Sequence, residues 1–136
     1  MEQLRDNLST FETELTLSPQ EQQAIQQTVA ELLKAEPVPC TGCEYCMPCP
    51  FGVDIPEVFQ RYNNYKLFEN KARTYQAYFE QLKPFARADQ CRSCGKCMQA
   101  CPQKLQIPAL LAKAHTELLQ VCAAVQSEKT GSSDKA

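Results

Sequence analysis

The sequence predicts an all-α fold, and three observations support this prediction. Apolar residues outside the cysteine-rich segments recur at helical spacing, and no stretch alternates with the period of two that marks a strand. Prolines stand where helices would begin or end. A unit of cysteine run, Cys-Pro, four residues and Ile-Pro occurs twice, at Cys49–Pro56 and Cys101–Pro108. This duplication predicts a pseudo-two-fold internal repeat.

The first predicted helix follows Ser18. Ser18 is expected to be the N-cap, Pro19 to occupy the first turn, and Glu21 to complete a capping box. The apolar residues of this helix then form one stripe, and prolines 37 and 39 end it before the first cysteine run. The stripe consists of Ile25, Val29, Leu32 and Leu33.

Three further helices are expected between and after the cysteine runs. Pro56 opens the first, with Phe59, Tyr62, and Leu67 or Phe68 facing inward. The next ends at Pro84 and holds the apolar residues Ala72, Tyr75, Tyr78, Phe79 and Leu82. Pro108 opens the last, whose apolar face consists of Leu111, Ala114, Leu118, Cys122 and Val125.

Length and charge exclude several classes of protein. A chain of 136 residues is long enough for one core, and the formal net charge of −2 leaves no basic surface typical of nucleic-acid binding. No run approaches 18 apolar residues, so we expect no membrane span. The first residues lack the pattern of a secretory signal, which predicts the reducing cytoplasm as the compartment.

Eight of the nine cysteines form two short runs, each ending in Cys-Pro. The first is Cys40-x2-Cys43-x2-Cys46-x2-Cys49, and the second is Cys91-x2-Cys94-x2-Cys97-x3-Cys101. Three thiolates at three-residue steps can bind three corners of one iron–sulfur cube, and the second run matches the bacterial two-cluster ferredoxin signature. The sequence therefore predicts two [4Fe-4S] clusters and an electron carrier.

The ferredoxin signature predicts crossed ligand sets, because the fourth cysteine of a run binds the other cluster. Cluster 1 would take Cys40, Cys43, Cys46 and Cys101; cluster 2 would take Cys91, Cys94, Cys97 and Cys49. The first run has two residues instead of three before its last cysteine. The uncrossed alternative, in which Cys49 and Cys101 each close the cluster of their own run, therefore stays open.

Other interpretations of the cysteines fit less well. Zinc needs four ligands per ion and does not call for a third evenly spaced cysteine or a Cys-Pro ending. Disulfides are rare in a reducing compartment. Cys122 is expected to be a small buried apolar residue, and His115, the only histidine, a solvated or partly packed helix residue. Arg92, Lys96 and Lys104 are expected to offset cluster charge or to dock an acidic redox partner.

Two resemblances to known families follow from these residues. The 41 residues between the cysteine runs resemble the spacing of the α-helical ferredoxin fold in the iron–sulfur subunits of succinate dehydrogenase and fumarate reductase. The segment from Pro39 to Pro56, with Tyr62-Asn63 and Cys101-Pro102-Gln103, closely resembles the C-terminal region of the iron–sulfur aldo/keto reductases. Those are predicted oxidoreductases with a (β/α)8 barrel followed by a dicluster α-helical ferredoxin domain.

The resemblance implies a domain organisation. Residues 1–17 look like the family's barrel-proximal stretch, residues 18–127 would form the α-helical ferredoxin domain, and residues 128–136 would be a disordered tail. No residue matches the catalytic motifs of the barrel, so no catalytic residue is expected in this chain. The partner implied is a redox protein, or an aldo/keto reductase barrel that is covalently linked or separate. An alternative is a structural or interaction domain in which the clusters act as staples.

Overall fold

The computed structural model describes residues 2–12 and 16–131. These residues form two compact units, one within Met1–Ala35 and one within Glu36–Ala136. All secondary structure in the described ranges is helical, as the sequence predicts. No helix among the described residues has the length and apolar character required to cross a membrane.

The first unit contains helices α1 (Glu2–Glu12) and α2 (Pro19–Lys34). The predicted capping box of α2 is present: the Ser18 backbone N–H donates to the Glu21 carboxylate over 2.8 Å, and the Glu21 N–H donates to the Ser18 hydroxyl over 3.3 Å. The predicted apolar stripe of α2 is exposed, since neither helix buries any described residue. Helix α1 was not expected from the sequence.

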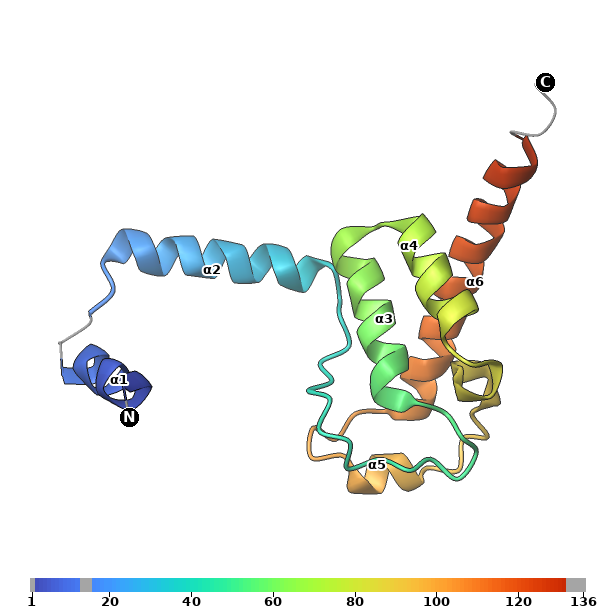
Figure 1. Ribbon diagram of the computed structural model, residues 1–136, viewed down its shortest axis with the longest axis horizontal. Helices are drawn as coiled ribbons and strands as arrows, with labels where there is room; N and C mark the ends of the chain where they lie inside the picture. Colours follow the sequence, from blue (N-terminus) through green and yellow to red (C-terminus); the bar gives the residue numbers. More distant parts are fainter. Residues whose placement is uncertain (1, 13–15, 132–136) are drawn as a thin grey trace. The chain divides into compact units, whose positions relative to one another are not determined.

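The second unit is built on three helical segments that pack against one another. These are α3 (Ile55–Phe68), α4 (Lys71–Tyr75), which continues into the π-helical η1 (Gln76–Gln81), and α6 (Ile107–Gly131). Helices α3, α4 and α6 contact each other pairwise (Figure 1). Their shared core contains large side chains that are almost fully buried: Ile55, Phe59, Tyr62, Tyr78, Leu111 and Leu118.

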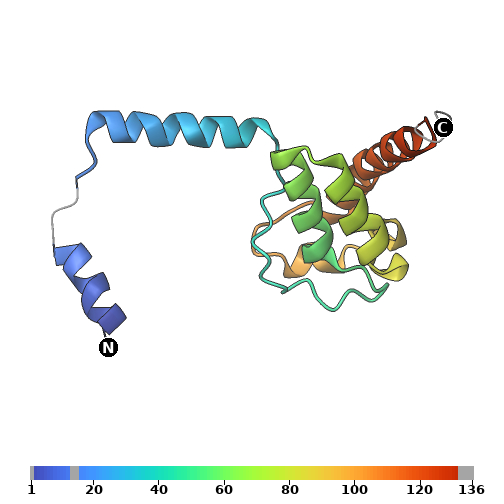
Figure 2. The same cartoon turned by 45° about the horizontal axis from the view of Figure 1, so that its top comes forward.

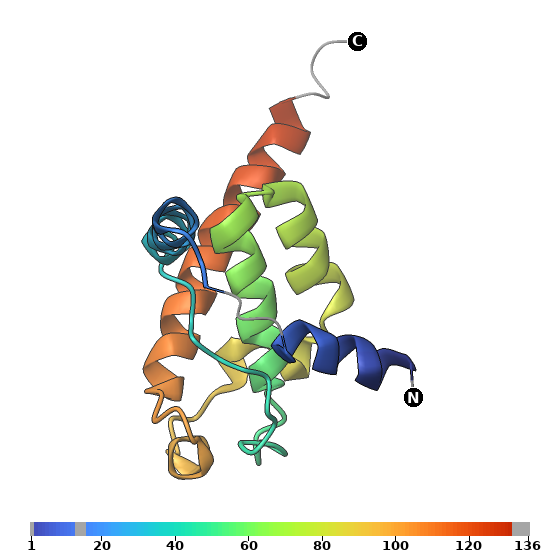
Figure 3. The ribbon, with the colours of Figure 1, turned by 90° about the vertical axis from the view of Figure 1, so that its left-hand side faces the viewer.

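The cysteine runs lie together at one end of this packed layer. The loops that carry them and the short helix α5 (Lys96–Ala100) gather below the first turn of α3 (Figure 2) and the first turn of α6 (Figure 1). A view at right angles shows the same grouping (Figure 3). Two 3-10 turns, η2 (Pro84–Ala86) and η3 (Ala88–Gln90), lead from η1 into the second run.

Three sequence predictions for this unit are corrected by the structure. Leu67 and Phe68 are 38% and 74% exposed, because α3 ends there with Glu69 in the left-handed region. The helix predicted up to Pro84 changes to π-helical geometry at Gln76, which shifts the face that its side chains present. Helix α6 extends to Gly131, so the predicted tail is helical over residues 128–131, where no proline or glycine interrupts the chain before Gly131. Residues 132–136 of that tail lie outside the described residues.

Candidate metal centres

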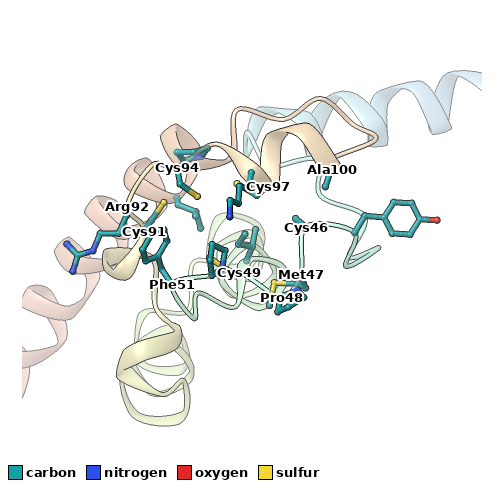
Figure 4. A pocket seen from close by; sticks show the side chains of 16 residues that line it. Cys46, Met47, Pro48, Cys49, Phe51, Cys91, Arg92, Cys94, Cys97 and Ala100 are labelled. Atoms are coloured by element: carbon teal, nitrogen blue, oxygen red, sulfur yellow. The ribbon is translucent and has the colours of Figure 1, made fainter.

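Two cavities at this end of the unit collect the eight cysteines of the two runs. The larger has a volume of about 190 Å³ and is formed by the second run together with the end of the first (Figure 4). Its wall is completed by apolar groups that include Ile55 and Leu111. The cysteines that line it are Cys91, Cys94, Cys97, Cys49 and, at one edge, Cys46.

The smaller cavity lies on the side of the first run. Its free volume is about 20 Å³, and its apolar wall includes Phe59 and Ile107. The cysteines that line it are Cys40, Cys43, Cys46 and Cys101. Each cavity therefore combines three consecutive cysteines of one run with the last cysteine of the other run, and Cys46 lines both.

The backbone of the two runs repeats, which explains why the two cavities resemble each other. Left-handed φ angles occur at Gly42 and Glu44 in the first run, at 66° and 63°. Ser93 and Gly95, 51 residues later, have φ angles of 52° and 77°. These left-handed residues let each loop curl between its cysteines. A third pair, Gly52 (81°) and Lys104 (55°), stands three residues after the last cysteine of each run.

The segment entering the first run is fixed by a side chain of α3. Asn63 accepts a hydrogen bond from the Val38 N–H over 2.7 Å and donates one to the Val38 carbonyl over 2.8 Å. Val38 is buried and stands two residues before Cys40. The Asn63 amide thus pairs with the backbone as a neighbouring strand would, and it satisfies both polar groups of a buried residue.

The segment entering the second run is fixed through Tyr78 of η1. The buried Ala88 N–H donates to the Tyr78 hydroxyl over 3.1 Å, and this hydroxyl lies 3.1 Å from Nδ1 of His115 on α6. Since the Tyr78 oxygen accepts from Ala88, its own proton is free to be donated to Nδ1. Arg87 adds two hydrogen bonds, to the carbonyls of Phe79 and Leu82.

The protein environment disfavours free thiolates in these cavities. Burial, with smaller contributions from the neighbouring thiols of Cys40, Cys97 and Cys101, raises the pKa of the Cys46 thiol to about 11. Burial also raises the pKa of Cys97, with Cys91 as the next cause. Thiols in such surroundings stay protonated near neutral pH unless a metal compensates their charge.

The two cavities differ in the charges around them. Arg92 and Lys96 line the larger cavity, and Arg92 extends away from the cysteines (Figure 4). Glu44 is the charged residue in the wall of the smaller cavity. Arg92, Lys96 and Glu44 are all exposed. The charged side chains in the cavity walls are therefore cationic at the larger cavity and anionic at the smaller one.

The donor chemistry suits clusters better than single ions. In the part of the chain that the structure describes, no three cysteine, histidine, aspartate or glutamate side chains lie close enough to hold one metal ion. A zinc ion with Zn–S bonds of about 2.3 Å would need thiolates about 3.8 Å apart, whereas an iron–sulfur cube holds them further apart. Soft thiolates in groups of four suit iron–sulfur clusters.

Paired cavities lined by cysteines at one end of a helical layer are typical of iron–sulfur domains. Residues 39–105 match the model of the 4Fe-4S dicluster domain family, so the chain carries a 4Fe-4S dicluster domain. With its helical architecture, this confirms the predicted α-helical ferredoxin-like fold. A search of curated proteins and a search of solved structures each gave no match.

Two residues singled out in the sequence, Cys122 and His115, lie outside both cavities, and two residues that anchor the cysteine runs were not predicted. Cys122 is half-buried on α6, remote from both cysteine sets in the sequence and absent from both cavity walls. His115 is half-buried and bonded to Tyr78. Sequence reasoning did not identify Asn63 or Tyr78 as anchors of the runs. The repeat offered a signal, because Asn63 and His115 each stand eight residues after the isoleucine of Ile-Pro.

Proposed function

We propose that this chain is an electron-transfer module that binds two [4Fe-4S] clusters. One observation carries the proposal: each cavity is lined by three cysteines at three-residue steps and by the last cysteine of the other run. That is the arrangement expected when the Cys-Pro cysteine of a two-cluster ferredoxin motif binds the second cluster. The 4Fe-4S dicluster domain in residues 39–105 supports the same proposal.

The proposed ligand sets are crossed. Cluster 1 would be held by Cys40, Cys43, Cys46 and Cys101, and cluster 2 by Cys91, Cys94, Cys97 and Cys49. When bound, each cluster supplies one-electron reduction and oxidation. The chain contributes apolar walls that exclude water, and backbone N–H groups that can donate to sulfur. One such contact is present between the Ser93 N–H and Cys91 Sγ, at 3.5 Å.

The ligand sets can be tested in a background that leaves one cluster only. Replacing Cys40, Cys43 and Cys46 with serine removes three ligands of cluster 1 and should leave about four iron atoms per chain. In this background Cys49→Ser should abolish the remaining cluster, whereas Cys101→Ser should leave it intact. Cys122→Ser serves as the matched control. The opposite result for Cys49 and Cys101 would establish the uncrossed alternative.

A second candidate function is favoured by the composition of the cavity walls. Ile55, Ile107 and Leu111 belong to the buried core and also line the cavities, so bound clusters would complete the core and act as staples. Anaerobic reduction with dithionite, followed by EPR spectroscopy, separates the two functions. Two reducible clusters support the relay, and clusters that keep one oxidation state at all accessible potentials support the staple.

We also propose that the chain works in the cytoplasm with an oxidoreductase partner, either a separate redox protein or an aldo/keto reductase barrel. The support is the resemblance of the segment around the first run and of residues 1–17 to that family. Residues 18–127 would then be the ferredoxin domain. The reading frame upstream of Met1 tests the covalent form of this partnership, because it would encode the barrel.

A further inference from the structure

The two halves of the repeat carry opposite charge. Residues 36–60 contain four acidic residues, Glu36, Glu44, Asp54 and Glu57, and neither lysine nor arginine. Residues 83–104 contain five basic residues, Lys83, Arg87, Arg92, Lys96 and Lys104, and one acidic residue, Asp89. The duplicated cysteine unit is thus set in an acidic segment in one half and in a basic segment in the other.

Most of the basic residues of the second half are available to a partner. Arg87 is used internally, since its guanidinium donates to two backbone carbonyls and lies 5.5 Å from the Phe79 ring. Arg92, Lys96 and Lys104 are exposed and form no ion pair within the described ranges of the chain. In the acidic half, by contrast, Glu36 and Glu57 are paired with Lys113 and Arg61.

Exposed aromatic side chains stand beside these cations. Phe51 is 44% exposed and lines the larger cavity together with Arg92 and Lys96. Phe85 is 61% exposed, and its carbonyl packs closely on Gly52, the residue after Phe51. Lys83 Nζ lies 5.8 Å from the centre of the Phe85 ring. We call the surface formed by Phe51, Lys83, Phe85, Arg92 and Lys96 the basic aromatic surface.

We propose that an acidic electron-transfer protein docks on the basic aromatic surface and exchanges electrons with the cluster of the larger cavity. This inference rests on the proposed function and adds the class of partner and the place where it binds. Aromatic groups supply contact area at the centre of an interface, and surrounding charges steer the encounter and set the orientation. Because Arg92, Lys96 and Phe51 also form the cavity wall, a partner docked there lies directly against the cluster ligands.

Charge complementarity decides the kind of partner. A [4Fe-4S] cluster with four thiolates carries a charge of about −2, which by itself would repel an acidic protein. Arg92 and Lys96 oppose this charge in the wall of the larger cavity. At the smaller cavity Glu44 adds to it, and the exposed Lys104, which stands between the wall residues Gln103 and Leu105, offsets Glu44. The larger cavity therefore offers an acidic partner the greater excess of cations.

The test uses the double variant Arg92→Glu/Lys96→Glu and two small oxidants of opposite charge. The dithionite-reduced protein is mixed with the anionic cobalt(III)–EDTA complex or with cationic hexaamminecobalt(III), and the rate of cluster oxidation is followed. The readout is the rate constant for the anionic oxidant divided by the rate constant for the cationic oxidant. A change in cluster potential would move both rate constants in the same direction and would leave this ratio nearly unchanged. At low ionic strength this ratio should fall by about tenfold or more in the variant, and salt at about 0.5 M should remove the difference.

The matched control is Lys71→Glu/Arg73→Glu, which makes the same charge change on exposed residues of α4, at the opposite end of α3. It should leave the ratio within about twofold of the unsubstituted protein, since separated surface charges are screened. An unchanged ratio in Arg92→Glu/Lys96→Glu, or an equal fall in the control, would overturn the proposal. Iron, sulfide and EPR measurements precede the kinetics, so a failure of the proposed function is seen separately as missing or redox-inactive clusters.

A protein probe completes the test. Electron exchange with a flavodoxin, an acidic one-electron carrier, should slow as ionic strength rises in the unsubstituted protein. In Arg92→Glu/Lys96→Glu the exchange should be slow and insensitive to salt. Equal rates in the two proteins would contradict the proposal. Binding to phosphatidylserine vesicles that requires Arg92 and Lys96 would assign the basic aromatic surface to a membrane and replace the protein partner.

Discussion

Asn63 and His115 occupy equivalent positions of the internal repeat, and each fixes the segment that leads into one cysteine run. Asn63 does so directly, with two hydrogen bonds to Val38. His115 does so through the Tyr78 hydroxyl, which accepts the N–H of Ala88. The two halves therefore use the same helix position for the same structural task, with one additional side chain in the second half.

The Asn63 anchor predicts a specific loss of stability. Asn63→Ala leaves the buried Val38 N–H without a partner, while the Val38 carbonyl keeps the hydrogen bond from the Cys40 N–H over 2.7 Å. The lost N–H partner should lower the free energy of unfolding by about 1–3 kcal/mol. Asn63→Asp keeps an acceptor for the N–H but loses the donor to the carbonyl, so it should cost less than Asn63→Ala. Anaerobic urea denaturation, followed by circular dichroism, measures both.

Asn64→Ala is the control for this prediction. Asn64 is exposed, and the side-chain hydrogen bonds to Val38 come from Asn63. Its replacement should change stability by less than about 0.5 kcal/mol. Equal effects of the two alanine variants would show that the bonds to Val38 do not stabilise the fold.

Tyr78→Phe should remove the second anchor without creating a cavity. The Ala88 N–H would lose its acceptor in a buried position, which should cost about 1–3 kcal/mol. Tyr45→Phe is the matched control, because Tyr45 is 70% exposed. Urea denaturation at neutral pH should show a lower free energy of unfolding for Tyr78→Phe only. Unchanged stability of both variants would contradict the role of the Tyr78 hydroxyl.

The same pair of variants predicts a pH dependence. Burial raises the pKa of Tyr78, whereas an unfolded tyrosine ionises near about 10. The protonated Tyr78 therefore contributes its full stabilisation to the folded protein below about pH 10. This contribution falls by about 1.4 kcal/mol per pH unit as the pH rises from there to the pKa of Tyr78 in the folded protein. Tyr78→Phe should lack this contribution, so the stability difference between it and the unsubstituted protein should narrow above pH 10. A constant difference from pH 9 to 11 would show that Tyr78 titrates normally.

Gly42 and Gly52 should respond differently to alanine. Both have left-handed φ angles, at which alanine costs about 1 kcal/mol. A β-carbon at Gly42 meets no atom within 4 Å, whereas at Gly52 it would lie 3.3 Å from the Phe85 carbonyl oxygen. Gly52→Ala should therefore destabilise the protein more than Gly42→Ala in urea denaturation. The reverse order would mean that the turn after Cys49-Pro50 can shift away from Phe85.

The unequal charges around the cavities predict opposite shifts in reduction potential. Lys96→Gln removes a positive charge from the wall of the larger cavity and should lower the potential of one cluster. Glu44→Gln should raise the potential of the other. Each shift in reduction potential should be about 20–40 mV, which corresponds to about 0.5–1 kcal/mol for the transfer of one electron near an exposed charge. EPR-monitored redox titration checks both, and shifts of the same sign would contradict the assignment.

Helix boundaries followed from local chemistry and could therefore be predicted. The Ser18 cap, Pro56 and Pro108 each mark a helix start that the structure confirms. The exposure of Phe68 could not be predicted, because apolar spacing does not show where the neighbouring helix stops covering it. The π-helical geometry that begins at Gln76 also leaves no clear pattern in the sequence.

The cysteine spacing predicted which thiols come together, but it did not predict the contacts that hold the cysteine runs in place. Three-residue steps and the Cys-Pro endings are local features, so the sets of thiols could be proposed from the sequence alone. The bond from Asn63 to Val38 joins residues 25 positions apart, and the bond from Tyr78 to His115 joins residues 37 apart. Contacts of this kind depend on how the helices pack, which periodicity does not determine.

Cys46 lines both cavities, and only two residues, Met47 and Pro48, separate it from Cys49. The Cys46 side chain therefore belongs to the wall of both cavities. In the proposed two-cluster protein, the short segment from Cys46 to Cys49 would join the ligand sets of both clusters, so a change at either cysteine would be felt at both.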